Sequence, residues 1–166
     1  DLAKANSDIS AIALQSLRVD EILWETREEL IKRKKDYTVT IEFHESIEDE
    51  TKLTVKGNHH LLKTAIVNLM DNACKFSPDK TVHIFLSTHG NYTTIDFVDK
   101  GIGIKKTELE KIFHPFFRAE SAKNILGNGL GLTLSEKIIK IHQGTITISS
   151  ELKKGTKVTI QLPILI

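Results

Sequence analysis

The chain has 166 residues, with 23 lysines and arginines against 22 aspartates and glutamates, so its formal net charge is +1. This balance gives no argument for binding to nucleic acid or to a membrane surface. Hydrophobic residues make up 40% of the chain, which is typical of a globular core, and the length fits one domain with a short appendage. The single cysteine, Cys74, excludes an internal disulfide and a multi-cysteine zinc site.

The chain begins with Asp1 and contains no signal peptide and no apolar run long enough to span a bilayer. We therefore expect it to be an excised fragment of a longer protein. In residues 1–18 apolar side chains follow a three-four spacing, which predicts the tail of a helix that packs in a bundle. The folded domain is expected to cover residues 19–166.

Asp20 is expected to cap a second helix, which ends at the basic cluster of residues 32–35. The later elements, read from alternation, helical periodicity and turn residues, are strands at 37–43 and 52–55, a helix opened by Gly57 and Asn58, strands at 81–88 and 92–98, a helical turn near 106–112, a helix at roughly 130–142 and a hairpin over 144–163. Several mostly antiparallel strands with three helices on one face predict an α/β two-layer sandwich.

The stretch NLMDNACKFS, residues 68–77, carries two asparagines and a lysine within an apolar helix. On a helical wheel Asn68, Asn72 and Lys75 form a narrow stripe beside the broad apolar one, so we expect them to line a cleft at the margin of the core. The two amide oxygens can reach a cation such as Mg²⁺, and Lys75 can contact a phosphate oxygen. Taken alone, the motif favours asparagines that bond only to water or to nearby backbone.

Two glycine-rich segments follow this helix. In DKGIGI, residues 99–104, Asp99 can accept a hydrogen bond from an exocyclic amine such as that of adenine, and the two glycines let a flat base approach. In isolation an ordinary Asp-Gly turn is the better interpretation. GNGLGL, residues 127–132, leads into a helix and can present backbone N–H groups to phosphate. It matches neither the Rossmann nor the Walker pattern, and the protein-kinase triplets are absent.

Between the glycine segments lies IFHPFFR, residues 112–118, in which three phenylalanines around Pro115 predict an aromatic cluster. Residues 119–126 are polar with little apolar anchoring, and we expect them to be mobile. Aromatics at one end and glycines at the other indicate a lid over a ligand. The alternative is a hydrophobic plug followed by a disordered surface loop.

The order and spacing of these four motifs resemble the catalytic, ATP-binding domain of bacterial sensor histidine kinases, where they are called the N, G1, F and G2 boxes. The resemblance covers roughly residues 37–164 and implies the Bergerat fold, which the wider superfamily shares with gyrase, the MutL repair protein and a heat-shock chaperone. The F box and the Gly-Leu-Gly-Leu ending of the G2 box point to the kinases within that superfamily.

This resemblance implies a site for ATP and Mg²⁺. Asn68 and Asn72 match the residues that hold the metal, and Lys75 matches a phosphate contact. Asp99 matches the residue that reads the adenine amino group, and Arg118 is expected to reach the γ-phosphate; with Asn68, Asn72 and Lys75 it completes the predicted catalytic set. The other nucleotide-binding positions that the resemblance implies are Phe76, Gly101, Gly103, Ile104, Phe117, Gly127, Asn128, Gly129, Leu130, Gly131, Leu132 and Thr133.

The phosphoacceptor of the family lies on a preceding helical hairpin in a His-Glu/Asp-x-x-Thr/Asn-Pro setting, and none of the seven histidines here lies in that setting. We infer that the acceptor hairpin lies outside this chain and that residues 1–18 are its last turns. The resemblance then implies transfer of the γ-phosphate to that hairpin, in cis or in trans, and from there to a response regulator. It also implies a cytoplasmic domain of a parent anchored in the bacterial inner membrane, with a monomeric fragment and a homodimeric parent.

Two alternatives stay open at this stage. One keeps the fold and changes the acceptor, as in a serine kinase of the anti-sigma type or an ATPase. Against the ATPase, Asn68 stands where the hydrolysing members of the superfamily usually carry the glutamate that activates water. The other alternative is a degenerate nucleotide-sensing or docking module without transfer chemistry, which the four intact motifs do not support.

Overall fold

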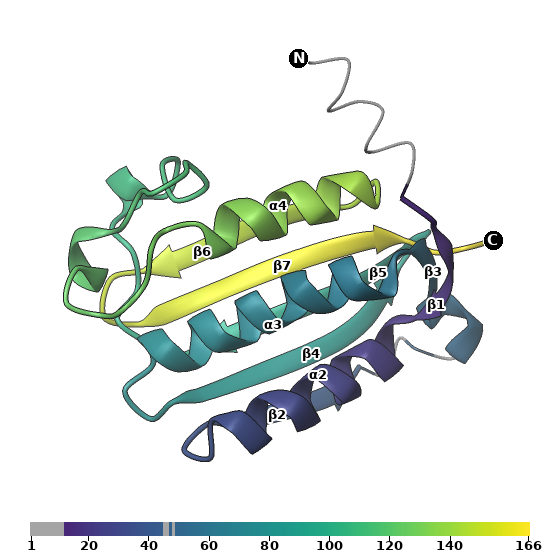
Figure 1. The fold of residues 1–166 in the computed structure, drawn as a ribbon, viewed down its shortest axis with the longest axis horizontal. Coiled ribbons are helices and arrows are strands. Elements are labelled where there is room, and N and C mark those ends of the chain that lie inside the picture. Colours follow the sequence, from purple (N-terminus) through teal and green to yellow (C-terminus); the bar gives the residue numbers. More distant parts are fainter. Residues whose placement is uncertain (1–11, 45–46, 48) are drawn as a thin grey trace.

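The computed structural model describes residues 12–44, 47 and 49–166, and within them three helices cover one face of a five-stranded sheet (Figure 1). The helices are α2 (Val19–Arg33), α3 (His59–Phe76) and α4 (Gly131–Ile141). The strands, from one edge of the sheet to the other, are β2 (Thr38–Phe43), β4 (Thr81–His89), β5 (Tyr92–Asp99), β7 (Gly155–Pro163) and β6 (Thr145–Glu151). This arrangement confirms the predicted α/β two-layer sandwich.

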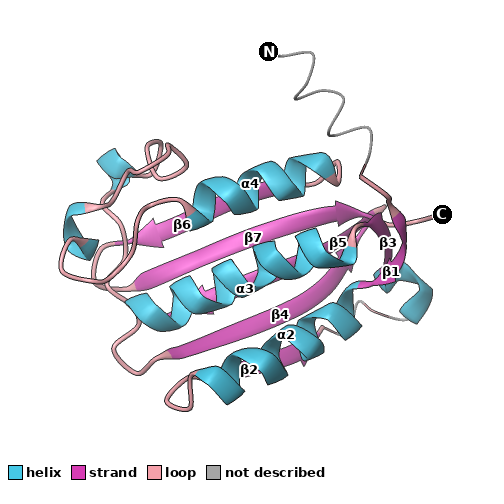
Figure 2. Cartoon of the chain, viewed as in Figure 1, coloured by secondary structure: helices cyan, strands magenta, loops and turns pink. Residues whose placement is uncertain are grey.

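The sheet is mixed, because β2 runs parallel to β4 while every other neighbouring pair is antiparallel. In Figure 2 the arrows of β6 and β7 point in opposite directions. The two predicted hairpins are confirmed as β4–β5 and β6–β7. The register of the central pair sets Asp99, the last residue of β5, opposite Thr156 at the start of β7. The carboxylate that the sequence analysis singled out therefore lies at one end of the sheet, on the strand beneath α3.

A second, two-stranded sheet corrects the prediction for the start of the chain. Gln15–Arg18 form β1, which pairs antiparallel with β3 (Thr54–Gly57) and sets Leu17 opposite Val55. The helix tail predicted for residues 1–18 is thus wrong over residues 12–18, where pairing of β1 with a strand distant in the sequence overrides the local spacing. Residues 1–11 lie outside the described residues, so their assignment to a helical hairpin stays a prediction.

Two smaller predictions are also corrected. Asp20 does not cap α2; its carboxylate accepts hydrogen bonds from the guanidinium of Arg18, which is itself the N-cap residue. The predicted strand at 52–55 begins only at Thr54, since Glu50–Leu53 form a 3₁₀ turn whose N-cap, Asp49, accepts a hydrogen bond from the Thr51 N–H at 2.9 Å. Within the described residues, none of the helices has the length and hydropathy that crossing a bilayer requires.

Helix α3 is the centre of the core. The side chain of Asn58 caps its start by accepting a hydrogen bond from the Leu61 N–H at 3.1 Å, and it ends just before Pro78, which disfavours a helical residue ahead of it. Its buried face consists of Leu62, Ala65, Ile66, Leu69, Met70, Ala73 and Cys74. Each buried leucine or isoleucine contributes roughly 1.5–3 kcal/mol, so this face holds α3 firmly on the sheet.

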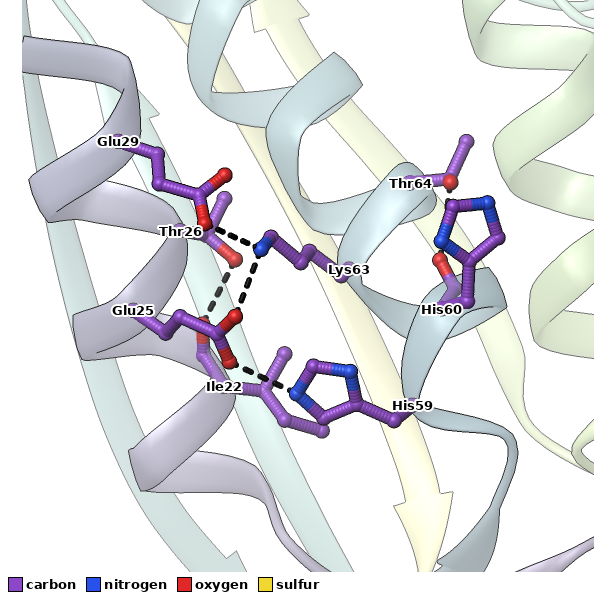
Figure 3. A network of polar contacts seen from close by, with 8 residues as sticks. All are labelled: Ile22, Glu25, Thr26, Glu29, His59, His60, Lys63 and Thr64. Carbon is purple, nitrogen blue, oxygen red and sulfur yellow. Dashed lines mark hydrogen bonds and ion pairs between the residues drawn. The ribbon is translucent and has the colours of Figure 1, made fainter.

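Polar contacts join α2 to α3 on the outer surface of the helical layer (Figure 3). The ammonium of Lys63 lies between Glu25, at 2.7 Å, and Glu29, at 2.5 Å, and the ring of His59 lies 2.7 Å from Glu25. All four side chains are partly exposed, so water screens these pairs and each adds little stability. Their effect is to fix the spacing of the two helices.

A buried histidine joins α4 to the start of α3. The Nδ1 of His142 lies 2.7 Å from the carbonyl oxygen of Ile138, and its Nε2 accepts a hydrogen bond from the Asn58 N–H at 3.0 Å. This pattern requires the neutral ring with its proton on Nδ1, because a proton on Nε2 would face another donor. Burial lowers the pKa of His142 below its ordinary value.

His142 should therefore make the fold less stable in acid. Its pKa is lower in the folded chain than in the unfolded chain, so the free energy of unfolding rises with pH up to about pH 6.5 and falls on acidification through the folded pKa. We expect His142→Gln to reduce the difference in unfolding free energy between about pH 5.5 and about pH 7.5, measured by urea denaturation. His60→Gln, at an exposed position, is the control. An unchanged pH dependence in His142→Gln would contradict this role.

Candidate nucleotide-binding site

One cavity of about 310 Å³ brings the four sequence motifs together, between the C-terminal half of α3, the end of β5 and the segment 112–131. The predicted site residues that line it are Asn68, Asn72, Lys75, Phe76, Asp99, Gly103, Ile104, Phe117, Arg118, Gly127, Asn128, Gly129, Gly131 and Leu132. Three predicted residues, Gly101, Leu130 and Thr133, are not among the lining residues. Asn68 and Gly131 are 63 residues apart in the chain, and only the fold joins them.

Asp99 is a buried carboxyl in the wall of the cavity. It is 7% exposed, and its Oδ1 accepts a hydrogen bond from the Gly101 N–H at 2.8 Å. Burial raises the pKa of this carboxyl to about 6, while hydrogen bonds from the backbone N–H groups of Gly101 and Thr156 act in the opposite direction. Near neutral pH the Asp99 carboxyl is therefore mainly ionised. A buried carboxylate that can accept a hydrogen bond suits recognition of an exocyclic amine.

The turn after Asp99 is packed too tightly for side chains. A Cβ on Gly101 would lie 2.3 Å from the carbonyl oxygen of Phe76, and that same oxygen accepts a hydrogen bond from the Ile102 N–H at 3.1 Å. Gly103 has a φ of +66°, and a Cβ there would lie 2.0 Å from the carbonyl oxygen of Glu151. Gly101 thus contributes close contact between the turn and the end of α3 instead of lining the cavity.

The polar stripe of α3 forms a second wall, opposite the glycine loop of residues 127–131. The Nδ2 of Asn68 lies 3.5 Å from the carbonyl oxygen of Gly131, and the Nδ2 of Asn72 lies 4.0 Å from the position of a Cβ on that glycine. The Nζ of Lys75 lies 3.3 Å from the position of a Cβ on Gly127. The three side chains line the cavity at the margin of the core, where the helical wheel places them.

The F box is fastened to the glycine loop by main-chain contacts. The Phe116 N–H donates a hydrogen bond to the carbonyl oxygen of Gly129 at 3.1 Å, and both residues have positive φ, +64° and +73°. A Cβ on Gly129 would lie 2.7 Å from the carbonyl oxygen of Phe117. Thr133 donates its hydroxyl hydrogen bond to the carbonyl oxygen of Phe113 at 2.9 Å, so its place is to anchor the F box.

Arg118 lines the cavity and holds the loop that follows it. Its Nη2 donates hydrogen bonds to the carbonyl oxygens of Ala122, at 2.7 Å, and Ile125. The loop is also tied to the G1 turn, because the Ser121 hydroxyl donates to the carbonyl oxygen of Gly103 at 3.1 Å and Lys105 pairs with Glu120 at 2.7 Å. The predicted contact of Arg118 with a γ-phosphate stays a prediction.

Several lining residues escaped the sequence analysis. The strands β6 and β7 contribute Ile148, Thr156 and Val158 to the cavity, and α3 contributes Asp71 between the two asparagines. Alternation along β7 does identify Thr156 and Val158 as facing the same side as the buried Ile160, but it does not say which helix or loop lies above them. Asp71 carried a signal in the sequence, since it is an ionisable group within the polar edge of an otherwise apolar helix.

The family profile of histidine kinase-, DNA gyrase B- and HSP90-like ATPases matches residues 57–166. The chain belongs to this family. It is thereby an ATP-binding domain, and its two-layer sandwich is the fold of the family. The N, G1, F and G2 boxes all lie in or directly beside the cavity, and the profile covers every one of them.

The chain is similar in sequence to several kinases. Sporulation kinase B of Bacillus subtilis is 34% identical over 140 residues, which cover 81% of this chain and 32% of that protein. Sensor histidine kinase RcsC of Escherichia coli is 32% identical over 120 residues, which cover 71% of this chain and 13% of that protein. The chain therefore spans about a third of the first relative's length and about an eighth of the second's.

Solved structures agree on the fold. The catalytic domain of histidine kinase ThkA superposes with a TM-score of 0.72 at 25% identity, over 91% of this chain and 95% of that domain. The mycobacterial sensor histidine kinase MprB gives a TM-score of 0.75 at 24% identity, over 90% of this chain and 97% of that one. Full-length ShkA, solved with AMPPNP, gives 0.73 at 20% identity and is covered to 33% of its length.

Gly101→Ala should disrupt the cavity around Asp99, because a Cβ there would overlap the carbonyl oxygen of Phe76 and the Oδ1 of Asp99. We expect a loss of about 1–3 kcal/mol in unfolding free energy and loss of nucleotide binding, measured by denaturation and calorimetry. Gly90→Ala is the matched control: its Cβ meets nothing within 4 Å, its positive φ costs a similar free energy, and nucleotide affinity should persist. Equal nucleotide affinities in the two variants would contradict this packing role.

Proposed function

We propose that this chain is the catalytic domain of a two-component sensor histidine kinase, which binds Mg²⁺ and ATP and transfers the γ-phosphate to a histidine on another segment of its parent. The observation that carries the proposal is the arrangement of Asp99 and the two asparagines along one cavity. Asp99 lies beside Phe76, the last residue of α3. Asn68 lies on the same helix eight residues before Phe76, which places it about 12 Å from Phe76 along the helix axis. That separation suits a nucleotide with its base at Asp99 and its phosphates at the asparagines.

The base end would be read by Asp99 as a hydrogen-bond acceptor. One carboxylate oxygen already accepts the Gly101 N–H, which leaves acceptor capacity for an exocyclic amine. The close approach of Gly103 to the β6–β7 turn keeps this side of the cavity free of side-chain bulk. Apolar side chains of Ile104, Ile148 and Val158 supply surface against which a flat base can pack.

The phosphate end combines oxygen ligands with a positive charge. Asn68 and Asn72 would hold Mg²⁺ through amide oxygens, and this donor set fits a hard cation that prefers oxygen. When bound, the metal would neutralise charge that develops on the phosphoryl oxygens. Lys75 would contact a phosphate oxygen, and the backbone of residues 127–131 at the start of α4 would face the triphosphate.

The phosphoacceptor is proposed to lie outside the chain. In the transfer, a nitrogen of the acceptor imidazole forms a bond to the γ-phosphorus while the bond from that phosphorus to the bridging oxygen breaks, and ADP leaves. The named relatives support a kinase, since RcsC is a sensor histidine kinase and ArlS of Staphylococcus epidermidis is a signal transduction histidine-protein kinase. Both are much longer than the matched region, which leaves room for an acceptor hairpin and a sensor.

From this function we infer the partners as well. The phosphohistidine of the parent would donate its phosphoryl group to an aspartate of a response regulator. The parent would act as a homodimer, with this domain on the cytoplasmic side of a membrane-anchored protein. Arg118, now bonded to the carbonyl oxygens of Ala122 and Ile125, would contact the γ-phosphate only if it exchanged at least one of these bonds for the nucleotide.

Asp99→Asn tests nucleotide recognition. Replacing an ionised acceptor by an amide puts a donor against the adenine amine, so we expect calorimetric binding of AMPPNP in Mg²⁺ to weaken by at least about a hundredfold. Wild-type chain in the same titration is the reference, and circular dichroism checks that the variant is folded. A folded wild-type chain that does not bind AMPPNP would overturn the proposal.

The transfer step has its own readout. With ATP carrying a labelled γ-phosphate and the acceptor hairpin of the parent restored, label should appear on protein in an acid-labile, base-stable form, as a phosphohistidine requires. Label that is stable to acid would instead indicate a serine or threonine acceptor.

A further inference from the structure

Asp71 is a charged residue of the cavity wall for which the nucleotide-binding motifs give no reason. It lies on α3 three residues after Asn68 and four before Lys75, and these spacings make side chains neighbours on a helix. It lines the same cavity as both of them and is half-buried. The residue therefore lies on the part of α3 against which the phosphates would lie.

The charges of the cavity wall explain why this position matters. In the part of the chain that the structure describes, four acidic or basic side chains line the cavity and their formal charges cancel: Asp71 and Asp99 are acidic, and Lys75 and Arg118 are basic. Asp99 is engaged at the base end by the Gly101 N–H, and Arg118 is engaged with two loop carbonyls. At the asparagine end Asp71 thus offsets Lys75, and a triphosphate meets no net positive charge from the side chains there.

Mg²⁺ changes this balance. Magnesium sites in nucleotide enzymes usually combine one or two carboxylates with the phosphates of the substrate, whereas amide oxygens carry no charge. Asp99 lies at the other end of the cavity, so among the described lining residues Asp71 is the carboxylate nearest in the helix to Asn68 and Asn72. A negative charge at this point attracts the cation and repels a triphosphate that lacks one.

Asp71 also acts on a neighbouring side chain. The hydroxyl of Tyr37, which precedes β2, has a pKa raised above its ordinary value by burial and then by the negative charge of Asp71. The carboxylate of Asp71 therefore exerts its charge on the groups around it.

We propose that Asp71 makes nucleotide binding at this site depend on Mg²⁺, by attracting the cation beside the two asparagines and repelling a metal-free triphosphate. The proposal rests on the proposed function, since it assumes that the phosphates lie against the polar stripe of α3. It assigns to Asp71 a role in selecting the metal-bound form of the substrate.

The test compares two dissociation constants of AMPPNP for the full chain, one in Mg²⁺ and one in EDTA, measured by calorimetry. We expect Asp71→Asn to bind more tightly than wild type in EDTA and more weakly in Mg²⁺, so that the ratio of the two constants falls by at least about tenfold. In the same variant, Mg²⁺ titrated into the chain saturated with AMPPNP should bind at least about tenfold more weakly. Neither readout depends on turnover.

Two control variants separate charge from structure. Glu42→Gln removes an exposed carboxylate on β2 outside the cavity, and its ratio should equal that of wild type. Tyr37→Phe removes the hydroxyl and keeps the Asp71 carboxylate, so it should retain most of the Mg²⁺ dependence. If Asp71 served only to hold Tyr37, both Tyr37→Phe and Asp71→Asn would lose stability alike and leave the ratio unchanged.

The outcomes distinguish this inference from the proposed function. A wild-type chain that binds AMPPNP in Mg²⁺ while a folded Asp71→Asn keeps the wild-type ratio would overturn the role of Asp71 alone. A folded wild-type chain that binds AMPPNP in neither condition would overturn the nucleotide site itself.

Discussion

Helix α3 buries seven residues against the five-stranded sheet, and this packing fixes the direction in which its polar edge points. Because Leu69, Met70 and Ala73 face the core, Asn68, Asn72 and Lys75 can only lie at the rim of the helix. The loop that precedes α4 lies against this rim. The same burial that stabilises the domain therefore aims the residues proposed to hold Mg²⁺ and phosphate, and no separate loop has to order them.

The other end of the site depends on close approach between backbone segments. Glycines at positions 101, 103 and 155 let the turn after β5, the end of α3 and the β6–β7 turn meet within distances that exclude a Cβ. Asp99 is buried at this junction, where losing water raises its pKa and two backbone N–H groups offset part of that cost. A dry carboxylate held by fixed donors is a rigid acceptor, which favours one orientation of a base over others.

Local sequence patterns predicted the helices, strands and turns whose conformation depends on residues close together in the chain. The periodicity of α3, the alternation of the four hairpin strands and the glycines of the turns each report a preference that the chain shows within a few residues. The strand at Gln15–Arg18 is different, because it forms only through pairing with β3. The spacing of its own residues does not indicate a partner 36 to 42 residues away. The start of β3 was missed for a similar reason, since the capping of a 3₁₀ turn by Asp49 competes with an extended chain.

The candidate site likewise combines residues that local patterns identify with residues that only distant contacts bring into place. Motif residues such as Asn68 and Asp99 carry their chemistry in type and spacing, so the sequence pointed to them before the cavity was known. Arg118 was expected at a γ-phosphate, yet its guanidinium bonds to loop carbonyls that become neighbours only when the loop folds back. The wall formed by Ile148 and Val158 likewise follows from the order of strands in the sheet.

The most direct test of the nucleotide site is a crystal structure of the full chain with AMPPNP and Mg²⁺. We expect the adenine amine within hydrogen-bonding distance of the Asp99 carboxylate, and the triphosphate and metal against the side chains of Asn68 and Asn72. Density for the nucleotide in the reverse orientation, or on a surface outside this cavity, would contradict that arrangement.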